Sequence, residues 1–323
     1  MNDNLVAASL IAFGLSCVLS WLLVREKIFK VLDYPNTRSM HAFPVPRTGG
    51  VAIVISILSS WLIIPSVPLL LWAGVALMAL ISFIDDIRPL PVWFRLVFHS
   101  MIAWMYVASL LYLPYGGFLT FIVGLALIWM INLFNFMDGS DGLAAGMALI
   151  GFGAYGLGAL QMADEIFAAV NFCIAGSTAA FLLFNFHPAR IFMGDVGSIP
   201  LGFLVGALGV YGWLNGLWLP WFPLLIFSPF IVDASATLIK RLCKGERIWH
   251  AHRDHYYQRL VLSSGWGHRN TALFAYGLMF TASAIALSVI SQDWERQGMI
   301  VVTVYGAYLV AMLVYDYRQP VNS

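Results

Sequence analysis

Charged residues are scarce in this chain. Asp, Glu, Lys and Arg make up 10% of its 323 residues, 61% of the residues are hydrophobic, and the mean hydropathy is +0.83. A soluble globular domain carries about 25% charged residues, so the composition excludes a soluble protein and predicts a polytopic membrane protein. The net charge of +1 says little about partners, and no nucleic-acid partner is expected.

Cysteine is also rare, with Cys17 and Cys173 in apolar runs and Cys243 in a basic segment. Three isolated thiols exclude a disulfide framework and a thiol metal motif. The first apolar run has no Lys or Arg before it and no clear cleavage site before Arg25. It lacks the marks of a cleaved signal peptide, so we expect it to be a retained membrane helix.

Long apolar runs fill most of the sequence. A membrane-spanning helix needs about 20 apolar residues, and the runs lack the alternating pattern of barrel strands. Pro65 and Pro68 interrupt one long run, which we interpret as a tight helical hairpin. We predict an all-α fold, a single integral-membrane domain over 1–323, and about ten to eleven transmembrane helices: 5–24, 49–64, 69–84, 93–113, 118–135, 142–160, 166–185, 198–214, 217–239, 270–290 and 299–316.

The basic residues orient these helices. If residues 25–48 lie in the cytoplasm, sixteen of the seventeen Lys and Arg residues fall on the cytoplasmic side, and only Arg296 falls outside. This asymmetry follows the positive-inside rule. We therefore expect the N-terminus outside and the C-terminus inside. The loops with unusual polar residues then share the cytoplasmic face, where we expect the active site.

Five carboxylates stand out because acids are so few. They are Asp85 and Asp86 in FIDDIRPL, Asp138 and Asp141 in NLFNFMDGSDGL, and Asp195 in FMGDVGS. All three segments border predicted helices on the cytoplasmic side. This placement predicts a metal and phosphate site at the membrane surface.

The adjacent pair Asp85 and Asp86 is costly unless a cation or basic side chain lies near it. Such a pair can approach a metal-bound phosphate or accept a proton from an attacking phosphate. The structural alternative is a solvated helix end that tolerates two charges. Arg95 follows in the sequence, and it either contacts a diphosphate or marks the cytoplasmic edge of a helix.

The segment NLFNFMDGSDGL is the most specific of the three. Its polar residues Asn132, Asn135, Asp138 and Asp141 recur at every third position, which keeps side chains on roughly one face of a helix. Carboxylate and amide oxygens suit Mg²⁺, and two asparagines in the last turn of a span are expensive without a partner. The alternative is a polar turn in which Asp141 caps the following helix.

Other cytoplasmic loops carry further candidates. Asn185 and Asp195 flank FHPARIFMG, and Asp195 either caps the next helix or presents one rigid ligand. In the first loop, His41 and Arg47 stand in an irregular turn rich in proline and glycine, which either lines the site or is loop architecture. Asp233 lies inside a predicted span, where an acid is functional by default. We expect it to pair with Lys or Arg about two turns later.

The basic loop contains HAHRDH, which includes His252, Arg253 and His255. Three histidines could bind zinc. The neighbouring Lys and Arg residues argue instead for contacts with a diphosphate or sugar. A solvated loop with no role is the third interpretation.

Taken in order, these segments resemble the polyprenyl-phosphate N-acetylhexosamine-1-phosphate transferase family. The similarity covers nearly the whole chain and rests on RSMHAFPVPRTGG, the IDD pair, NLFNFMDGSDGLAAG, FNFHPARIFMGDVGS and HAHRDHYYQRL. Within the family, the chain looks most like the bacterial branch that initiates O-antigen synthesis. The resemblance implies a multi-pass enzyme of the bacterial inner membrane that transfers an N-acetylaminosugar 1-phosphate from a UDP-sugar to undecaprenyl phosphate and releases UMP.

The resemblance also implies roles for particular residues. Asn135 and Asp195 match ligands of Mg²⁺, for which Mn²⁺ can substitute, and Asp195 counts with Asp85 and Asp86 among the catalytic residues. The candidates for substrate binding, from the resemblance and from the loops themselves, are Arg95, Asn132, Asp138, Asp141, Asn185, His252, Arg253, His255 and His41. A homodimer is one arrangement that the resemblance allows.

Two other classes of membrane protein fit the sequence less well. A transporter or flippase for an anionic or lipid-linked substrate would concentrate polar groups and broken helices near the middle of the membrane, whereas here they gather at one face. A CDP-alcohol phosphotransferase would carry Asp-Gly-x-x-Ala-Arg, which is absent, since Gly142 is followed by Leu-Ala-Ala. The identity of the sugar is not visible in the sequence.

Overall fold

A computed structural model describes residues 2–26, 31–34, 40, 44–247, 252–262 and 264–319. Within them, β1 (Leu32–Asp33) and β2 (Val45–Pro46) form one short antiparallel pair. All other regular elements are helices, which confirms the all-α prediction: α1 (Asp3–Glu26), α2 (Gly49–Trp61), α3 (Leu69–Ile87), α4 (Val92–Phe136), α5 (Leu143–Gln161), α6 (Glu165–Asn185), α7 (Asp195–Leu214), α8 (Trp221–Ile226), α9 (Ser228–Cys243), α10 (Tyr256–Leu262), α11 (Gly267–Ser288) and α12 (Trp294–Arg318).

Two predicted spans run together in α4, which has 45 residues and includes Pro114. Gly116 interrupts it with non-helical backbone (φ 77°, ψ 175°), a conformation that glycine adopts without a steric penalty. On either side of this break, the rings of Trp104 and Phe121 lie 5.6 Å apart between centroids. The chain therefore reverses at Gly116, and α4 supplies both spans.

One other predicted span, 217–239, is divided into α8 and α9. Pro229 stands in the first turn of α9, where its missing N–H does no harm, whereas inside a continuous helix it would remove a hydrogen bond. Eight helices of the described residues are long and apolar enough to cross a membrane, with α4 counted once, and α2 is a shorter apolar helix.

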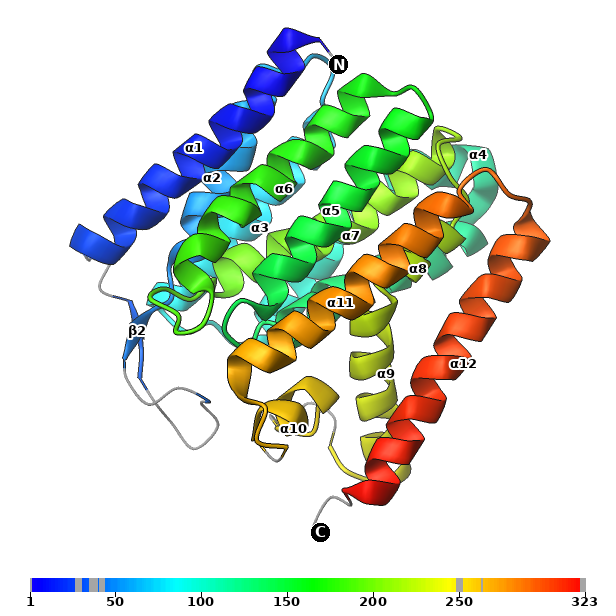
Figure 1. Cartoon of the computed structure of the whole chain (residues 1–323). Helices are drawn as coiled ribbons and strands as arrows, with labels where there is room; N and C mark the ends of the chain where they lie inside the picture. Colours follow the sequence, from blue (N-terminus) through cyan, green and yellow to red (C-terminus); the bar gives the residue numbers. More distant parts are fainter. Residues whose placement is uncertain are drawn as a thin grey trace.

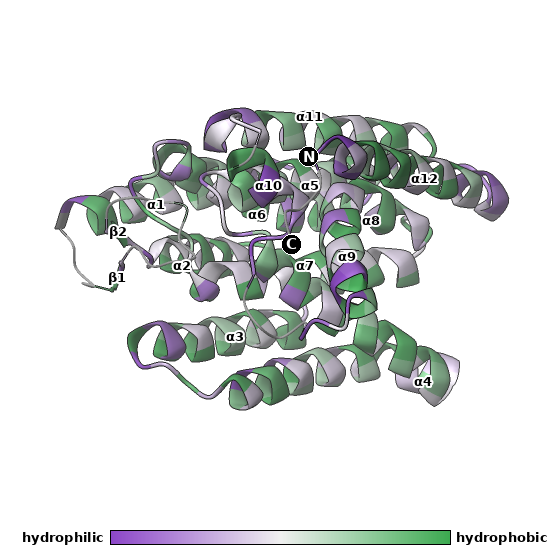
Figure 2. Ribbon diagram, turned by 90° about the horizontal axis from the view of Figure 1, so that it is seen from below, coloured by the Kyte–Doolittle hydropathy of each residue, from purple (hydrophilic) through white to green (hydrophobic). Residues whose placement is uncertain are grey.

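Helix α7 lies at the centre of the bundle (Figure 2). It packs against α2, α3, α4 and α5, and 78% of its most apolar stretch is buried, compared with 6% for α12. Gly202 allows the close approach of α4, because a Cβ atom there would lie 2.8 Å from the Cα atom of Ile131. The central position of α7 matters because its first residue is Asp195.

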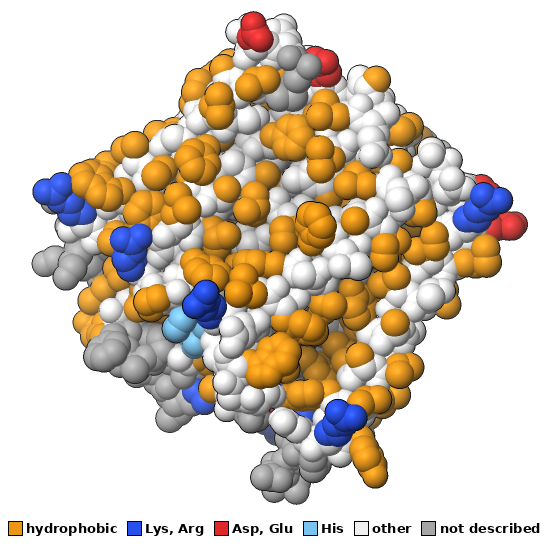
Figure 3. Space-filling model, in the orientation of Figure 1, with side chains coloured by type: hydrophobic (Ala, Val, Ile, Leu, Met, Phe, Trp, Pro, Cys, Tyr) orange, Lys and Arg blue, Asp and Glu red, His pale blue; other side chains and the backbone are white. Residues whose placement is uncertain are grey.

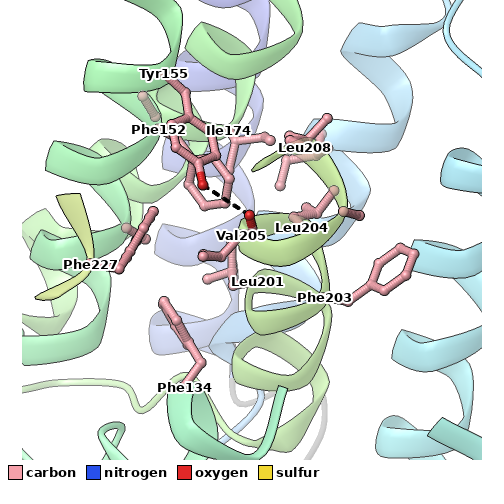
Figure 4. Packing of buried hydrophobic residues seen from close by; sticks show 14 of the residues in the cluster. Phe134, Phe152, Tyr155, Ile174, Leu201, Phe203, Leu204, Val205, Leu208 and Phe227 are labelled. Atoms are coloured by element: carbon pink, nitrogen blue, oxygen red, sulfur yellow. Dashed lines mark hydrogen bonds between the residues drawn. The ribbon is translucent and has the colours of Figure 1, made fainter. Parts of the chain in front are cut away.

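The core beside α7 is apolar and aromatic (Figure 4). Phe152 and Phe227 pack around Tyr155, whose hydroxyl donates to the backbone oxygen of Val205 at 3.0 Å. The only polar atom of this buried ring is thus satisfied, as buried polar groups generally are. This part of the core stabilises the bundle, and these residues offer no free polar group for catalysis.

The start of α1 and the end of α12 lie at opposite ends of the bundle (Figure 1). The end with α10 and the β1–β2 pair also holds the loops that carry the acidic motifs, which we call the loop face. It comprises residues 31–48, 85–91, 137–142, 186–194 and 244–266 as far as the structure describes them. The prediction that these loops share one end is confirmed. Which side of the membrane this end faces stays a prediction.

Candidate active site

A cavity of about 390 Å³ opens at the loop face. Polar side chains from loops far apart in the sequence surround it. Seven of them belong to the predicted site residues: Asp86, Asn135, Asp138, Asp141, Asn185, Asp195 and His252. The other lining residues are Asp33, Met40, Arg47, Gly139, Ser140, Phe192, Gly194, Gln258 and His268.

Asp195 is the first residue of α7, where the helix dipole favours a negative charge. Its Oδ1 accepts a hydrogen bond from Nδ2 of Asn135 at 2.9 Å, and its Oδ2 accepts one from Nη1 of Arg95 at 3.1 Å. The same amide of Asn135 donates to Oγ of Ser198 at 2.9 Å. The two predicted metal ligands, Asn135 and Asp195, are therefore in direct contact.

Gly194 makes this approach possible. Its φ is +70°, and a Cβ atom at this position would lie 2.3 Å from the backbone oxygen of Arg47 and 3.0 Å from Oδ2 of Asp86. Any side chain here would be strained and would also separate the first loop from the start of α7.

Asp85 is engaged on both oxygens. Oδ1 accepts from the backbone N–H of Leu90 at 2.7 Å, and Oδ2 accepts from Nη1 of Arg95 at 2.6 Å. Neither Asp85 nor Arg95 is among the described residues that line the cavity. Asp85 therefore fixes the turn between α3 and α4 and orients Arg95, which links it to Asp195.

Asp86 is the member of the pair that faces the cavity. It is buried, with 6% of its surface exposed. Nε of Arg47 lies 3.5 Å from its Oδ1, and Nη2 of Arg47 donates to its backbone oxygen at 2.8 Å. Its Oδ2 has no hydrogen-bond partner among the described residues. A buried carboxylate oxygen without a partner is costly, so this atom is placed to receive a proton or a ligand.

Asp138 and Asn132 differ in their placement. Asp138 lines the cavity, and burial, followed by the charges of Asp195 and Asp86, raises the pKa of its carboxyl well above the ordinary value. Acids that crowd one cavity in this way favour a cation between them. Asn132 donates from Nδ2 to the backbone oxygen of Ile128 at 2.8 Å within α4. It is not one of the described lining residues, so its predicted contact with substrate finds no support in its position.

Asp141 is held by two histidines that were not among the predicted site residues. Its Oδ2 lies 2.6 Å from Nδ1 of His187 and accepts from the backbone N–H of Ala189 at 3.1 Å. The ring of His268 stacks on that of His187, with centroids 5.2 Å apart. Asp141 does not cap α5 as considered from the sequence, since the N-cap residue is Gly142 and it has no side-chain cap.

His268 joins two segments of the cavity wall. Its Nδ1 lies 2.9 Å from Oγ of Ser140, and its Nε2 lies 3.1 Å from the backbone oxygen of Met40. His187 could have been suspected from its place in FHPARIFMG between two candidate residues. His268 gave no such signal: it lies in the last residues of the basic loop between the predicted spans 217–239 and 270–290, and no motif includes it.

Asn185 braces the wall of the cavity. Its Oδ1 accepts from the backbone N–H of Gly142 at 3.1 Å, and its Nδ2 donates to the backbone oxygen of Ile191 at 2.9 Å. Both ends of the amide are thus used to join the 137–142 and 186–194 loops.

The histidines of the basic loop are placed differently from one another. His252 lines the cavity, and burial, with the nearby His255 and Arg241, lowers the pKa of His252 to about 4. It is therefore neutral at pH 7. His255 is 3% exposed and packs beside Phe136. Neither His255 nor Arg253 is one of the described residues around the cavity. The predicted contact of His41 falls outside the described residues.

Asp233 anchors the basic loop. Its oxygens accept the backbone N–H groups of Tyr256 and Tyr257, each at 2.9 Å, so it caps α10 from α9. The expected pairing of Asp233 with a later Lys or Arg is wrong, because Lys240 pairs with Asp316 and Arg241 pairs with Asp254.

The donors around the cavity suit a hard cation. No cluster of three or more His, Cys, Asp or Glu residues among those described could hold a metal by itself. One histidine of the three-histidine zinc alternative, His250, falls outside the described residues. Mg²⁺ is commonly bound by one or two carboxylates and completed by substrate phosphates and water. Asp195, Asn135 and the unpartnered oxygen of Asp86 fit that pattern.

Comparison with known proteins shows the family of the chain. A probable undecaprenyl-phosphate N-acetylglucosaminyl 1-phosphate transferase of Bacillus subtilis (strain 168) is 30% identical, over 79% of this chain and 77% of that protein. Residues 68–213 match glycosyl transferase family 4. The chain belongs to this family. It is therefore a transferase enzyme, and the resemblance predicted from its motifs is confirmed.

Other relatives of this family 4 transferase carry related names. A decaprenyl-phosphate N-acetylglucosaminephosphotransferase of Mycolicibacterium smegmatis is 31% identical, over 93% of this chain and 86% of that protein. A phospho-N-acetylmuramoyl-pentapeptide-transferase of Listeria welshimeri is 27% identical, over 76% of this chain and 84% of that protein. The family match includes Asp86, Asn135 and Asp195, whereas Arg47, His252 and His268 lie outside it.

Proposed function

We propose that this family 4 transferase moves an N-acetylaminosugar 1-phosphate from a UDP-sugar to undecaprenyl phosphate at the cytoplasmic face of the bacterial inner membrane. The products are undecaprenyl-diphosphate-sugar and UMP, and the step initiates O-antigen or another cell-envelope polysaccharide. The observation that carries the proposal is the cavity at the loop face. It gathers carboxylates, an amide and basic groups where the membrane helices end, so that a water-soluble nucleotide sugar and a membrane lipid can meet.

The names of the relatives support the substrate class. The three relatives named above are all called transferases. Two of the names include a polyprenyl phosphate and N-acetylglucosamine, and the third includes phospho-N-acetylmuramoyl-pentapeptide. Transfer between two phosphates needs mainly positioning and neutralisation of charge, and the cavity residues are of the types that provide both.

Asp195 and Asn135 would hold Mg²⁺, or Mn²⁺ in its place. The ion would neutralise charge on the diphosphate of the nucleotide sugar. In the structure the NH₂ group of Asn135 faces Asp195, so coordination through the amide oxygen requires the amide to rotate.

The two adjacent acids would divide their work. Asp86, with its unpartnered Oδ2, would receive the proton of the lipid phosphate or position that phosphate for attack on the β-phosphorus. Asp85 would act indirectly, because it orients Arg95. Arg47 would keep Asp86 turned toward the cavity. Asp138 and Asp141 would lie on the nucleotide side, and His252 near the diphosphate or sugar.

UMP release from the purified protein tests the proposal. We expect UMP only when undecaprenyl phosphate, Mg²⁺ and one UDP-N-acetylamino sugar are present together, and a screen of GlcNAc, GalNAc, FucNAc and QuiNAc donors identifies the sugar. EDTA should abolish the release, and added Mg²⁺ or Mn²⁺ should restore it. Asn135→Ala should raise the Mg²⁺ concentration that gives half of the maximal rate.

Absence of UMP with every donor would overturn the proposal. Substrate flux through proteoliposomes without lipid-linked product would favour the transporter or flippase alternative. The position of the cavity at one end of the bundle speaks against that alternative, which expects a central site.

A further inference from the structure

A second cavity lies on the other side of α10. Its volume is about 500 Å³, within the range of roughly 300–1,000 Å³ that is typical of ligand pockets. Residues of α5, α9, α10, α11 and α12 line it, and most are apolar, among them Phe230, Phe274, Leu278, Ala311 and Met312. Figure 3 shows hydrophobic side chains along a hollow between α11 and α12. We call this cavity the α11–α12 crevice.

The crevice exists because α12 leans away from the bundle. Within the described chain, α12 packs chiefly on α8 and α9, and it is much less buried than the other candidate spans. An apolar cavity of this kind is a poor site for water. In a bilayer the neighbouring molecules are lipids, so a hydrocarbon chain is the occupant that the lining favours.

The rim of the crevice at the loop face is basic. Arg318 lines the rim and is exposed. On the adjoining side of α12, Asp316 pairs with both Lys240 and Arg259, so two cations share one carboxylate there and Arg318 adds a third positive charge to the rim. Tyr256 belongs to the lining of the crevice and also of the basic pocket that contains Lys240 and Arg259. A positively charged rim suits the headgroup of an anionic lipid, and the apolar lining beside it suits an acyl chain.

We propose that the α11–α12 crevice binds one anionic phospholipid of the bilayer. An acyl chain occupies the slot between α11 and α12. The headgroup phosphate lies at Arg318, within the positive field of Lys240 and Arg259. The site is independent of which sugar the enzyme transfers.

The polyprenyl phosphate substrate is a poorer fit to this site. In the described part of the chain the crevice and the catalytic cavity share no lining residue. Tyr257 stands between them: it lines the crevice, its hydroxyl donates to the backbone oxygen of Phe136 at 2.9 Å, and it leaves no room for a Cβ atom at Gly139. A phosphate held at Arg318 therefore lies behind a wall from Asp86.

Through Tyr257 and α10, a lipid in the crevice can affect the catalytic cavity. Tyr257 belongs to α10, which directly follows the segment that carries His252. A chain that fills the crevice supports α10 from behind and so stabilises the placement of His252 at the cavity. We expect the occupied protein to be the more active one.

Photo-crosslinking tests the site. The full chain in detergent micelles is mixed with phosphatidylglycerol that carries a diazirine in its acyl chain, or with the corresponding phosphatidylcholine, and labelled peptides are mapped by mass spectrometry. We expect labelling in α9, α11 and α12, several-fold stronger for phosphatidylglycerol. Ala311→Phe, which fills the slot, and Arg318→Gln, which removes the rim charge, should each reduce it several-fold.

Matched variants on α12 are the controls. Val310→Phe adds a ring at a neighbouring residue that is 61% exposed, and Arg296→Gln removes a cation at the far end of the helix; both should label as the natural chain does. Equal labelling by the two lipids, undiminished labelling of Ala311→Phe, or displacement by undecaprenyl phosphate in preference to phosphatidylglycerol would overturn the proposal. UMP release should rise several-fold with phosphatidylglycerol in the natural chain and not in Arg318→Gln. A rise that is equal in both would also count against it.

Discussion

Arg95 of α4 donates to Asp195 of α7 at 3.1 Å although the two residues are 100 positions apart. The same guanidinium nitrogen donates to Asp85 of α3 at 2.6 Å. One side chain thus ties together the ends of three helices beside the cavity. Because Asp195 also holds Asn135, the position of Arg95 is linked to that of both predicted metal ligands.

Replacement of Arg95 should therefore impair catalysis more than binding. We expect Arg95→Ala to lower kcat by about 10²-fold, the size of loss seen when one electrostatic stabiliser is removed from an active site. Arg95→Lys should recover part of the rate, since an ammonium keeps the charge but lacks the fixed fork of the guanidinium. The control is Arg88→Ala, an exposed cation in the same connection between α3 and α4. Equal rates for Arg88→Ala and Arg95→Ala would contradict this role.

The two adjacent acids should respond differently to the loss of one charge. Asp86→Asn should lower kcat by roughly 10²–10⁴-fold, the usual contribution of a positioned acid or base, with little change in stability. Asp85→Asn should lower the unfolding temperature and kcat together, because it weakens the bonds to Arg95 and to the backbone of Leu90. Steady-state UMP release and thermal unfolding in detergent measure both effects. A fully active Asp86→Asn protein would show that this carboxylate is not needed.

Loss of His268 should weaken binding of the nucleotide sugar. His268→Ala removes the contacts that join Ser140 to Met40 across the cavity wall, so KM for the UDP-sugar should rise about tenfold, equivalent to roughly 1.4 kcal/mol, with a smaller change in kcat. Tyr276→Phe is the matched control, because the Tyr276 hydroxyl donates to the nearby backbone oxygen of Gly142 at 2.6 Å and lies outside the cavity lining described here. If both variants raise KM equally, His268 acts only through the stability of the turn.

The pH dependence of stability should carry a contribution from His252. Its pKa falls from the ordinary 6.5 to about 4 on folding, so between these values the unfolded chain binds more protons than the folded one. The contribution is complete above pH 6.5 and is lost as the pH falls toward 4. His252→Gln should therefore show a flatter fall of unfolding temperature between pH 7 and pH 4.5.

The neighbouring acid provides a control for this experiment. Asp254 raises the pKa of His252, so Asp254→Asn should not flatten the profile. Asp138, whose pKa is raised on folding, contributes with the opposite sign, but it is present in every variant and cancels in the comparison. Parallel profiles for the natural chain and His252→Gln would show that His252 does not titrate in this way.

Much of the architecture is predictable from local features of the sequence. The length of an apolar run sets the length of a membrane helix, so every predicted span coincides with helical structure, including the two that share α4 and the one divided between α8 and α9. The uneven distribution of Lys and Arg placed the polar loops at one end. The short spacing of Asn135 and Asp138 in one motif likewise indicated that both belong to one site.

The tertiary structure alone decided which side chains meet. Adjacent in sequence, Asp85 and Asp86 diverge because α3 ends there and each acid meets a different arginine, Arg95 or Arg47. Asn132 keeps the predicted spacing yet bonds its own helix. His268 enters the cavity wall from α11. Such partners come from segments far apart in the chain, and their contacts depend on how helices pack around α7, which no local pattern of residues records.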